Sequence, residues 1–113
     1  MTLLVQQRRE FEAWFIGLRD DFARKRVQAR ITRLEAGNYG DSKPARNGVV
    51  ELRIHYGPGY RLYTLKIARN AVVLLLGGTK ATQTADVAEA ADVASEIKAA
   101  LKRTARSALP GKK

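Results

Sequence analysis

The stretch from Val49 to Gln83 constrains the fold more than any other part of the chain, because it holds three consecutive strand patterns. Apolar and polar residues alternate from Val49 to Tyr56 and again from Tyr60 to Ile67, with Gly57-Pro58-Gly59 between the two segments. The run from Val72 to Leu76 is apolar throughout, which is typical of a central strand covered on both faces. The stretch therefore predicts an antiparallel meander of three strands.

Helical patterns precede this meander. Apolar side chains recur at the spacing of one helix face in two segments, namely Phe11, Trp14, Phe15 and Leu18, and then Ala23, Val27, Ile31 and Leu34. Asp20-Asp21 is the break between them and a plausible N-cap pair, and Gly37-Asn38 ends the second helix. We expect the two helices to form an antiparallel hairpin.

Shorter patterns complete the secondary structure. Leu3 to Val5 predicts a short first strand, and Lys43 to Arg46 predicts a short edge strand that leads into an Asn47-Gly48 turn. An Ala-rich third helix follows, for which Thr84 is the predicted N-cap. The fold class is therefore α+β, with an N-terminal helical hairpin packed on a small antiparallel sheet and a C-terminal helix.

Composition narrows the class of protein. The chain of 113 residues is long enough for one domain, which we assign to residues 1–104. It contains no Cys and a single His, so neither a disulfide framework nor a thiolate or His-rich metal site is expected, and no cofactor is predicted. No segment has the length of apolar sequence that a membrane span needs, and the N-terminus does not resemble a signal peptide. We expect a cytoplasmic protein.

The net charge of +10 favours a polyanionic partner such as nucleic acid or the ribosome, or an acidic protein. From Lys98 to Lys113 the chain carries six basic residues and no acidic one, whereas the other 97 residues carry 15 basic and 11 acidic residues. More than half of the excess charge therefore lies near the C-terminus, where it is either a solvated helix end or a polyanion contact. Residues 105–113 are expected to be a basic, disordered tail.

Strand register decides which polar side chains share a sheet face. If Gly57-Pro58-Gly59 is a three-residue connection, His55 pairs with Arg61 and Arg53 with Tyr63. If Arg69-Asn70 is a two-residue turn, Arg61 faces Gly78, and Lys80 returns to the same face. One end of the sheet would then gather five side chains on one face, which are Arg53, His55, Arg61, Tyr63 and Lys80. Gly78 would leave room beside Arg61 for a substrate backbone.

The rest of this face would be an apolar floor under the third helix, made of Leu65, Ile67, Val72 and Leu74. The opposite face, with Leu62, Val73 and Leu75, would suit the first two helices. A slip of one residue in either turn would move a whole strand's side chains to the other face.

Such a cluster could cleave RNA by attack of a ribose 2′-hydroxyl on the adjacent phosphate. This reaction needs a base, an acid, and a cation for the charge that develops on the phosphate. Arg61 suits the charge role because its planar guanidinium fits phosphate oxygens, and Lys80 or Arg53 could be a second cation. Histidine titrates near neutral pH, which makes His55 the candidate acid or base. The RNA-contacting candidates are Lys43, Arg46, Tyr63 and Arg30.

These residues also fit a plainer interpretation, in which the arginines and Lys80 are solvated surface residues and His55 is merely exposed. The basic side of the second helix can likewise be a solvated face. Charge and spacing alone leave both interpretations open.

Four motifs carry a family resemblance: G-N-x-G-D-x-K at Gly37–Lys43, E-L-R-I at Glu51–Ile54, G-P-G-Y-R-L-Y at Gly57–Tyr63 and L-L-L-G-G-x-K-x-x-Q at Leu74–Gln83. In this order of elements they resemble the RelE/ParE toxin superfamily, and more closely its addiction-module killer-protein branch of HigB-like proteins. The resemblance covers most of the chain and implies that residues 1–104 form a toxin domain of this type.

The resemblance implies the toxin of a type II toxin–antitoxin system, bound by a cognate antitoxin that is commonly a helix-turn-helix protein. RelE-like members cut messenger RNA on the ribosome without a metal, and by motif Arg61, Lys80 and Arg53 match the basic residues of that site. RelE has a functional tyrosine after its last strand, whereas residues 81–94 here contain none. His55 or Tyr63 would have to replace it. A toxin that inhibits DNA gyrase without cutting RNA, or a basic nucleic-acid-binding module, therefore remain alternatives.

Overall fold

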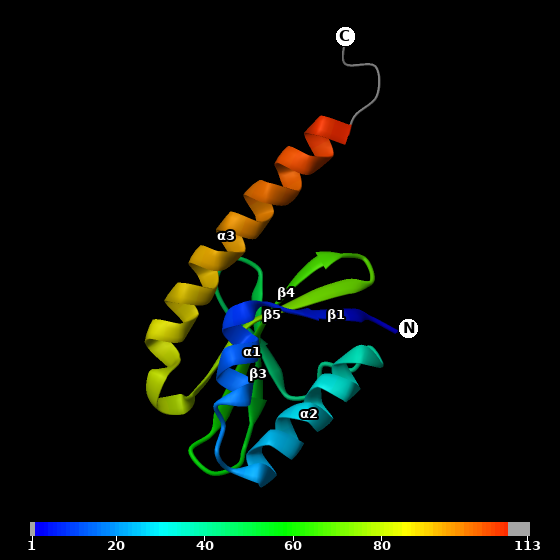
Figure 1. The fold of residues 1–113 in the computed structure, drawn as a ribbon. Coiled ribbons are helices and arrows are strands. Elements are labelled where there is room, and N and C mark those ends of the chain that lie inside the picture. Colours follow the sequence, from blue (N-terminus) through cyan, green and yellow to red (C-terminus); the bar gives the residue numbers. More distant parts are fainter. Residues whose placement is uncertain (1, 109–113) are drawn as a thin grey trace.

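The computed structural model describes residues 2–108 and shows a mixed α+β fold built on a five-stranded sheet (Figure 1). Along the chain the elements are β1 (Leu4–Gln7), α1 (Arg9–Ile16), α2 (Asp21–Glu35), β2 (Ser42–Pro44), β3 (Val49–Ile54), β4 (Tyr60–Ala68), β5 (Ala71–Thr79), the short 3-10 helix η1 (Lys80–Thr82) and α3 (Gln83–Ala108). The strands lie in the order β1-β5-β4-β3-β2. Helices α1 and α2 cover one face of the sheet, and α3 covers the other.

The predicted first strand is present, but it makes the sheet mixed rather than purely antiparallel. β1 lies parallel to β5, with Val5 opposite Val72 and Gln7 opposite Leu74. The other three strand pairs are antiparallel. A short apolar run signals a strand but carries no information on its partner or direction, so the expectation of a purely antiparallel sheet was wrong at this edge.

The two N-terminal helices form largely where expected. Asp20 caps α2, because its carboxylate accepts hydrogen bonds from the backbone N–H groups of Phe22 and Ala23 at 2.9 and 3.3 Å. The stripe predicted for this helix is buried, and consists of Ala23, Val27, Ile31 and Leu34. The helical hairpin is only partly realised, because α1 packs mainly on β5 and both helices contribute to one core against the sheet.

The turn at Asn47-Gly48 is confirmed, and both residues have positive φ angles of 60° and 82°. These angles suit a two-residue hairpin turn, for which Asn-Gly is the favoured sequence. The strand before the turn is the edge strand β2, which ends at Pro44 and pairs with β3.

The connection between β3 and β4 is longer than predicted. Ile54 pairs with Tyr60 and Arg53 with Arg61, so the loop spans five residues and the pairing of His55 with Arg61 was wrong. Tyr56 leaves the ladder because its hydroxyl donates to the Asp20 carboxylate at 3.0 Å, and Gly57 and Gly59 take positive φ angles. The error is two residues, an even number, so the side chains of β3 and β4 keep their predicted faces.

The pairing of β4 with β5 is confirmed at its start, where Arg61 faces Gly78 and Tyr63 faces Leu76. A bulge follows, because Thr64 faces Leu74 and Leu75 has no partner on β4. One extra residue reverses the faces of the strand beyond it. The faces assigned to β5 from Val72 to Leu75 were therefore wrong.

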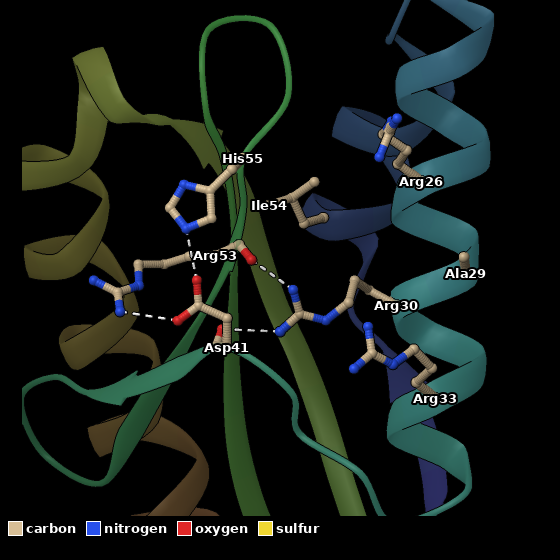
Figure 2. Close-up of a pocket in the computed structure, with 8 residues that line it drawn as sticks. All are labelled: Arg26, Ala29, Arg30, Arg33, Asp41, Arg53, Ile54 and His55. Atoms are coloured by element: carbon tan, nitrogen blue, oxygen red, sulfur yellow. Dashed lines mark hydrogen bonds and ion pairs between the residues drawn. The ribbon is translucent and has the colours of Figure 1, made fainter.

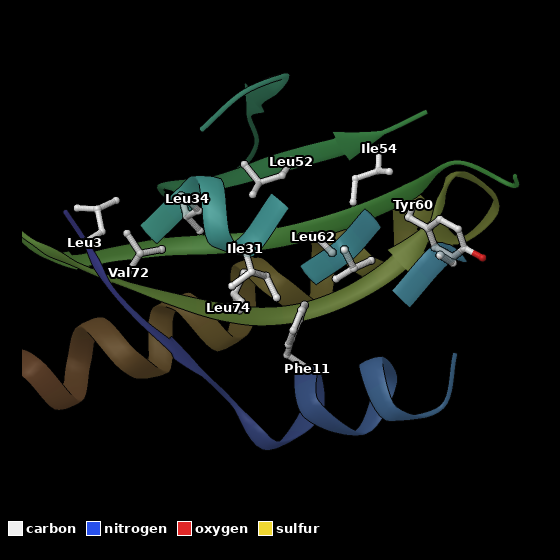
Figure 3. Packing of buried hydrophobic residues seen from close by; sticks show 12 residues of the cluster. Leu3, Phe11, Ile31, Leu34, Leu52, Ile54, Tyr60, Leu62, Val72 and Leu74 are labelled. Carbon is white, nitrogen blue, oxygen red and sulfur yellow. The ribbon is translucent and has the colours of Figure 1, made fainter. Parts of the chain in front are cut away.

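Two hydrophobic cores result, one on each face of the sheet. Val72 and Leu74 join the core under α1 and α2, and Figure 3 shows these side chains gathered with Phe11, Ile31 and Leu62 between helices and strands. Val73 and Leu75 instead join Tyr63 and Leu65 in the core under α3, together with Ala90 and Ala94 of the helix. Leu65 and Ile67 lie on the α3 face as predicted.

The third helix begins earlier than predicted. Thr79, not Thr84, provides the cap, because the Thr79 N–H donates to Thr82 Oγ1 at 3.2 Å and η1 leads directly into α3 at Gln83. The helix continues to Ala108 and extends well beyond the sheet (Figure 1). The rest of the predicted tail, residues 109–113, lies outside the described residues, and the domain boundary at 104 stays a prediction. Within residues 2–108, no helix is long and apolar enough to cross a membrane.

Candidate functional site

The α3 face of the sheet carries a row of polar side chains across its three central strands. Arg53 on β3 lies opposite Arg61 on β4, and Arg61 lies opposite Gly78 on β5. The next pair toward the middle of the sheet is Glu51 with Tyr63. Directly opposed residues share a face, so the structure brings Arg53, Arg61 and Tyr63 together as predicted.

Arg61 lies in a buried ion pair. Only 6% of Arg61 and 2% of Glu51 is exposed, and the Arg61 Nε lies 3.1 Å from Glu51 Oε2, without the alignment of a good hydrogen bond. Gln83, at the start of α3, donates its side-chain amide to both Glu51 oxygens at 3.0 Å. The carboxylate of Glu51 thus holds Arg61 from one side and the first turn of α3 from the other.

The outer end of the Arg61 side chain lies beside Gly59 and Lys80. A Cβ placed on Gly59 would be 3.8 Å from Arg61 Nη1 and 3.5 Å from the Lys80 Cβ. The Lys80 N–H donates to the Gly59 carbonyl at 2.7 Å, which ties the start of η1 to the β3–β4 loop. Lys80 itself is exposed, so the opening bordered by Gly59, Arg61 and Lys80 presents one solvated ammonium next to one mostly buried guanidinium. We call this opening the mouth of the Arg61 cluster.

Tyr63 and Gly78 do not offer the surface that the sequence suggested. The Tyr63 side chain is fully buried, so it presents no face on which a base could stack, and its hydroxyl has no hydrogen-bond partner within residues 2–108. Burial, and then the nearby charges of Glu51 and Asp86, hold the pKa of Tyr63 far above its usual range. The space beside Gly78 is filled, because a Cβ there would overlap the Asp86 carboxylate and the Thr82 hydroxyl. The expected room for a substrate backbone is therefore occupied by the chain itself.

His55 lies at the exit of β3, in a surface cluster centred on Asp41. One oxygen of the Asp41 carboxylate is 2.7 Å from His55 Nε2, and the other accepts from Arg53 Nη2 at 2.9 Å (Figure 2). These two contacts, first that of Arg53 and then that of His55, hold the pKa of Asp41 below its usual range. The His55 side chain is 73% exposed, so its other ring nitrogen is accessible to a ligand.

Arg30 is a structural residue rather than a free cation. It is buried, and its guanidinium donates to three backbone carbonyls, those of Arg53 at 2.5 Å, Tyr39 at 2.7 Å and Asp41 at 2.9 Å. As placed, only 7% of Arg30 is exposed, and its guanidinium is engaged by these carbonyls. Lys43 on β2 and Arg46 before the hairpin turn are both exposed, as an RNA contact would require.

Sequence reasoning missed how strongly the acidic residues organise this region. Glu51 holds Arg61, Asp41 holds Arg53 and His55, and Asp86 fills the space beside Gly78, yet none of these three acids was among the predicted site residues. The available signal was that Glu51 and Asp41 each stand two residues from a basic residue inside a motif. Across residues 2–108, no group of three or more His, Asp or Glu side chains is arranged to hold a metal ion.

Comparisons with known proteins bear on the family and the fold. The scan against protein-family models gives no match. The chain is 39% identical over 97 residues to an uncharacterized protein of Haemophilus influenzae (strain ATCC 51907 / DSM 11121 / KW20 / Rd), a match that covers 86% of this chain and 98% of that protein. Among solved structures, a chain in the crystal structure of the intact E. coli RelBE toxin–antitoxin complex matches with a TM-score of 0.55 and 14% identity, over 68% of this chain and 95% of that chain. The chain therefore belongs to the family of the Haemophilus influenzae protein, and its fold is RelE-like.

Proposed function

We propose that this protein is the toxin of a toxin–antitoxin pair and acts as a metal-independent endoribonuclease on ribosome-bound messenger RNA. Within the RelE-like fold we assign it to the addiction-module killer-protein branch of HigB-like proteins. The observation that carries the proposal is the set of cations at this end of the sheet, where Arg53 lies opposite Arg61 on the α3 face and Lys80 lies beside the outer end of the Arg61 side chain. The solved complex that shares the fold is a toxin–antitoxin complex, which agrees with this role.

In the proposed reaction Arg61 and Lys80 stabilise the charge on the phosphate that is attacked. The Glu51 carboxylate fixes the Arg61 side chain, so the guanidinium needs no rearrangement as charge develops. Lys80 is the solvated partner and the first cation that an approaching phosphate meets. Arg53, held by Asp41, contacts the backbone on one side of the cut.

The acid–base role falls to His55 in this proposal. Its Nε2 is engaged with Asp41, which leaves Nδ1 as the atom that exchanges a proton with the RNA. Tyr63 cannot take this role as the structure stands, because its hydroxyl is buried. It can act only if the first turn of α3 moves away.

The test is cleavage mapping of a messenger RNA on translating ribosomes with the purified protein. Lys80→Gln is the first variant, because Lys80 is exposed and its loss leaves the core intact, and Lys66→Gln is its matched control on an exposed residue elsewhere on the sheet. We expect cuts that weaken at least tenfold in Lys80→Gln and persist in Lys66→Gln. Intact RNA with all three proteins, under conditions where the chain arrests growth, would refute the nuclease.

A second candidate is a toxin that inhibits DNA gyrase without cutting RNA. The burial of Arg61 and its ion pair with Glu51 favour this alternative, because a guanidinium held in this way contacts a substrate poorly. DNA damage and inhibited supercoiling, with RNA intact, would establish it.

The antitoxin partner is proposed to cover the mouth of the Arg61 cluster. The mouth is basic, so an acidic or covering segment fits it. A saturating amount of the antitoxin should abolish cleavage, and activity that survives in the saturated complex would contradict this part of the proposal.

A further inference from the structure

A basic pocket opens on the α2 side of β3, separate from the mouth of the Arg61 cluster. It has a volume of about 330 Å³, and its walls come from α2, from the segment around Asp41 and from the end of β3. Arg26, Arg30 and Arg33 of α2 all border it (Figure 2). They follow the spacing i, i+4, i+7, so they form one stripe of about 10 Å along the helix.

The charge of this pocket is largely uncompensated. Three arginines of α2 line it, and the single carboxylate beside them, that of Asp41, is already engaged by Arg53 and His55. Arg30 forms the back wall and is tied to three carbonyls. Burial, and then the neighbouring charge of Arg33, lower the pKa of Arg30, because the two like charges lie one turn apart on the same helix.

Arg26 and Arg33 stand on either side of Arg30 and are both exposed. Arg26 lies over the Tyr56 ring, with its guanidinium carbon 4.8 Å from the ring centre, and this contact orients its planar group. Ala29 lies between them on the pocket wall, and its small side chain keeps the pocket open.

We propose that this pocket binds a backbone phosphate of the RNA, held mainly by Arg26 and Arg33. The inference rests on the proposed RNA-directed function and adds a second phosphate site to it. Arginine is suited to this role because its planar fork pairs with two phosphate oxygens at once. Arg53 lies between the two sites, because its carbonyl accepts from Arg30 at the pocket and its side chain lies on the α3 face opposite Arg61, so an RNA strand that passes around the end of β3 can reach both.

An acidic peptide is a less suitable ligand for this pocket, because the backbone groups of β3 that could pair with an added strand are already hydrogen-bonded. A peptide that added a strand to β3 would need the backbone groups of Arg53, beyond the start of β2. The Arg53 N–H already donates to the Asp41 carbonyl at 2.9 Å, and the Arg53 carbonyl accepts from Arg30. Only side-chain contacts remain, and these suit a phosphate.

The test measures binding without cleavage. The probe is a fluorescent 2′-O-methyl oligoribonucleotide of about six residues, which lacks the attacking hydroxyl, and a hexaglutamate peptide is the competing acidic probe. Ala29→Glu places a carboxylate in the pocket, and Gln28→Glu makes the same charge change one residue away, outside it. Arg33→Gln is paired with Arg69→Gln, an exposed arginine in the β4–β5 turn.

We expect Ala29→Glu to weaken RNA binding about tenfold and Gln28→Glu by less than about threefold. Arg33→Gln should lower the slope of log K against log salt by about 0.7, the value for one phosphate contact on a single strand, and Arg69→Gln should leave it unchanged. If each variant had the same effect as its control, the proposed phosphate site in this pocket would be refuted, although the protein would still bind RNA. Tighter binding of hexaglutamate than of RNA would also overturn it. Pocket-dependent binding by a protein that cuts no RNA would refute the nuclease and leave the pocket in place.

Discussion

The buried pair of Glu51 and Arg61 allows a sharp prediction about stability. Glu51→Leu removes the carboxylate and leaves the Arg61 guanidinium, whose side chain is only 8% exposed, without a counter-charge. Removing one partner of a buried ion pair costs about 3–5 kcal/mol, because the remaining charge stays desolvated. The amide of Gln83 loses its acceptor as well, but it is only half-buried and can turn to water.

The assay is urea denaturation, followed by circular dichroism. With a slope of about 1.5 kcal/mol per molar urea, the Glu51→Leu midpoint should fall by at least about 2 M. Glu10→Gln is the control, because it breaks the exposed ion pair of Glu10 with Arg8, whose atoms lie 3.3 Å apart. Exposed pairs contribute only about 0–1 kcal/mol, so the control midpoint should hardly move.

The double variant Glu51→Leu with Arg61→Met separates two effects, the loss of the ion pair and the cost of leaving the Arg61 charge buried without a partner. Two apolar side chains of similar volume should restore most of the stability, because a buried ion pair gains little over apolar packing. A loss below about 1 kcal/mol for Glu51→Leu, or a double variant as unstable as the single one, would show that Arg61 is not the desolvated charge that the structure indicates.

Three further predictions concern other parts of the fold. Gly77→Ala should destabilise by about 1–3 kcal/mol, because the new Cβ would lie 2.2 Å from the Trp14 ring; a urea midpoint equal to that of the wild type would contradict this packing. Tyr63→Phe should be neutral or stabilising, because it removes a buried hydroxyl that has no hydrogen-bond partner among the described residues. It should also reduce the loss of stability as pH rises above the usual tyrosine pKa of 10.0, because the raised pKa of Tyr63 favours the folded state only while the hydroxyl is protonated; a lower urea midpoint, or an unchanged alkaline profile, would contradict this account of Tyr63. Asp41→Asn should make the free energy of unfolding less dependent on pH in acid, because the lowered pKa of Asp41 makes the folded state lose stability as pH falls below the usual aspartate pKa of 3.8. Urea midpoints that fall in acid as steeply as those of the wild type would contradict the contacts of Asp41 with Arg53 and His55.

Much of the fold follows from local sequence patterns. The period of the apolar residues determined the type and order of the helices and strands, since a helix face and a strand face bury different spacings. The cap of α2 by Asp20 and the turn at Asn47-Gly48 could also be predicted from the sequence, because both depend on the chemistry of one or two residues. The shared face of Arg53, Arg61 and Tyr63 followed from the alternation of side chains along a strand.

Only the tertiary structure decided where these side chains stand relative to solvent. The bulge at Leu75 reverses the faces of β5, and the turn at Tyr56 removes His55 from the ladder, because contacts with distant residues outweigh the local pattern. Whether Arg61 and Tyr63 are exposed depends on the first turn of α3, which places Gln83 and Asp86 over them. The sequence by itself determined which residues carry charge and which face they share; long-range packing determined which of those charges are paired, buried or free.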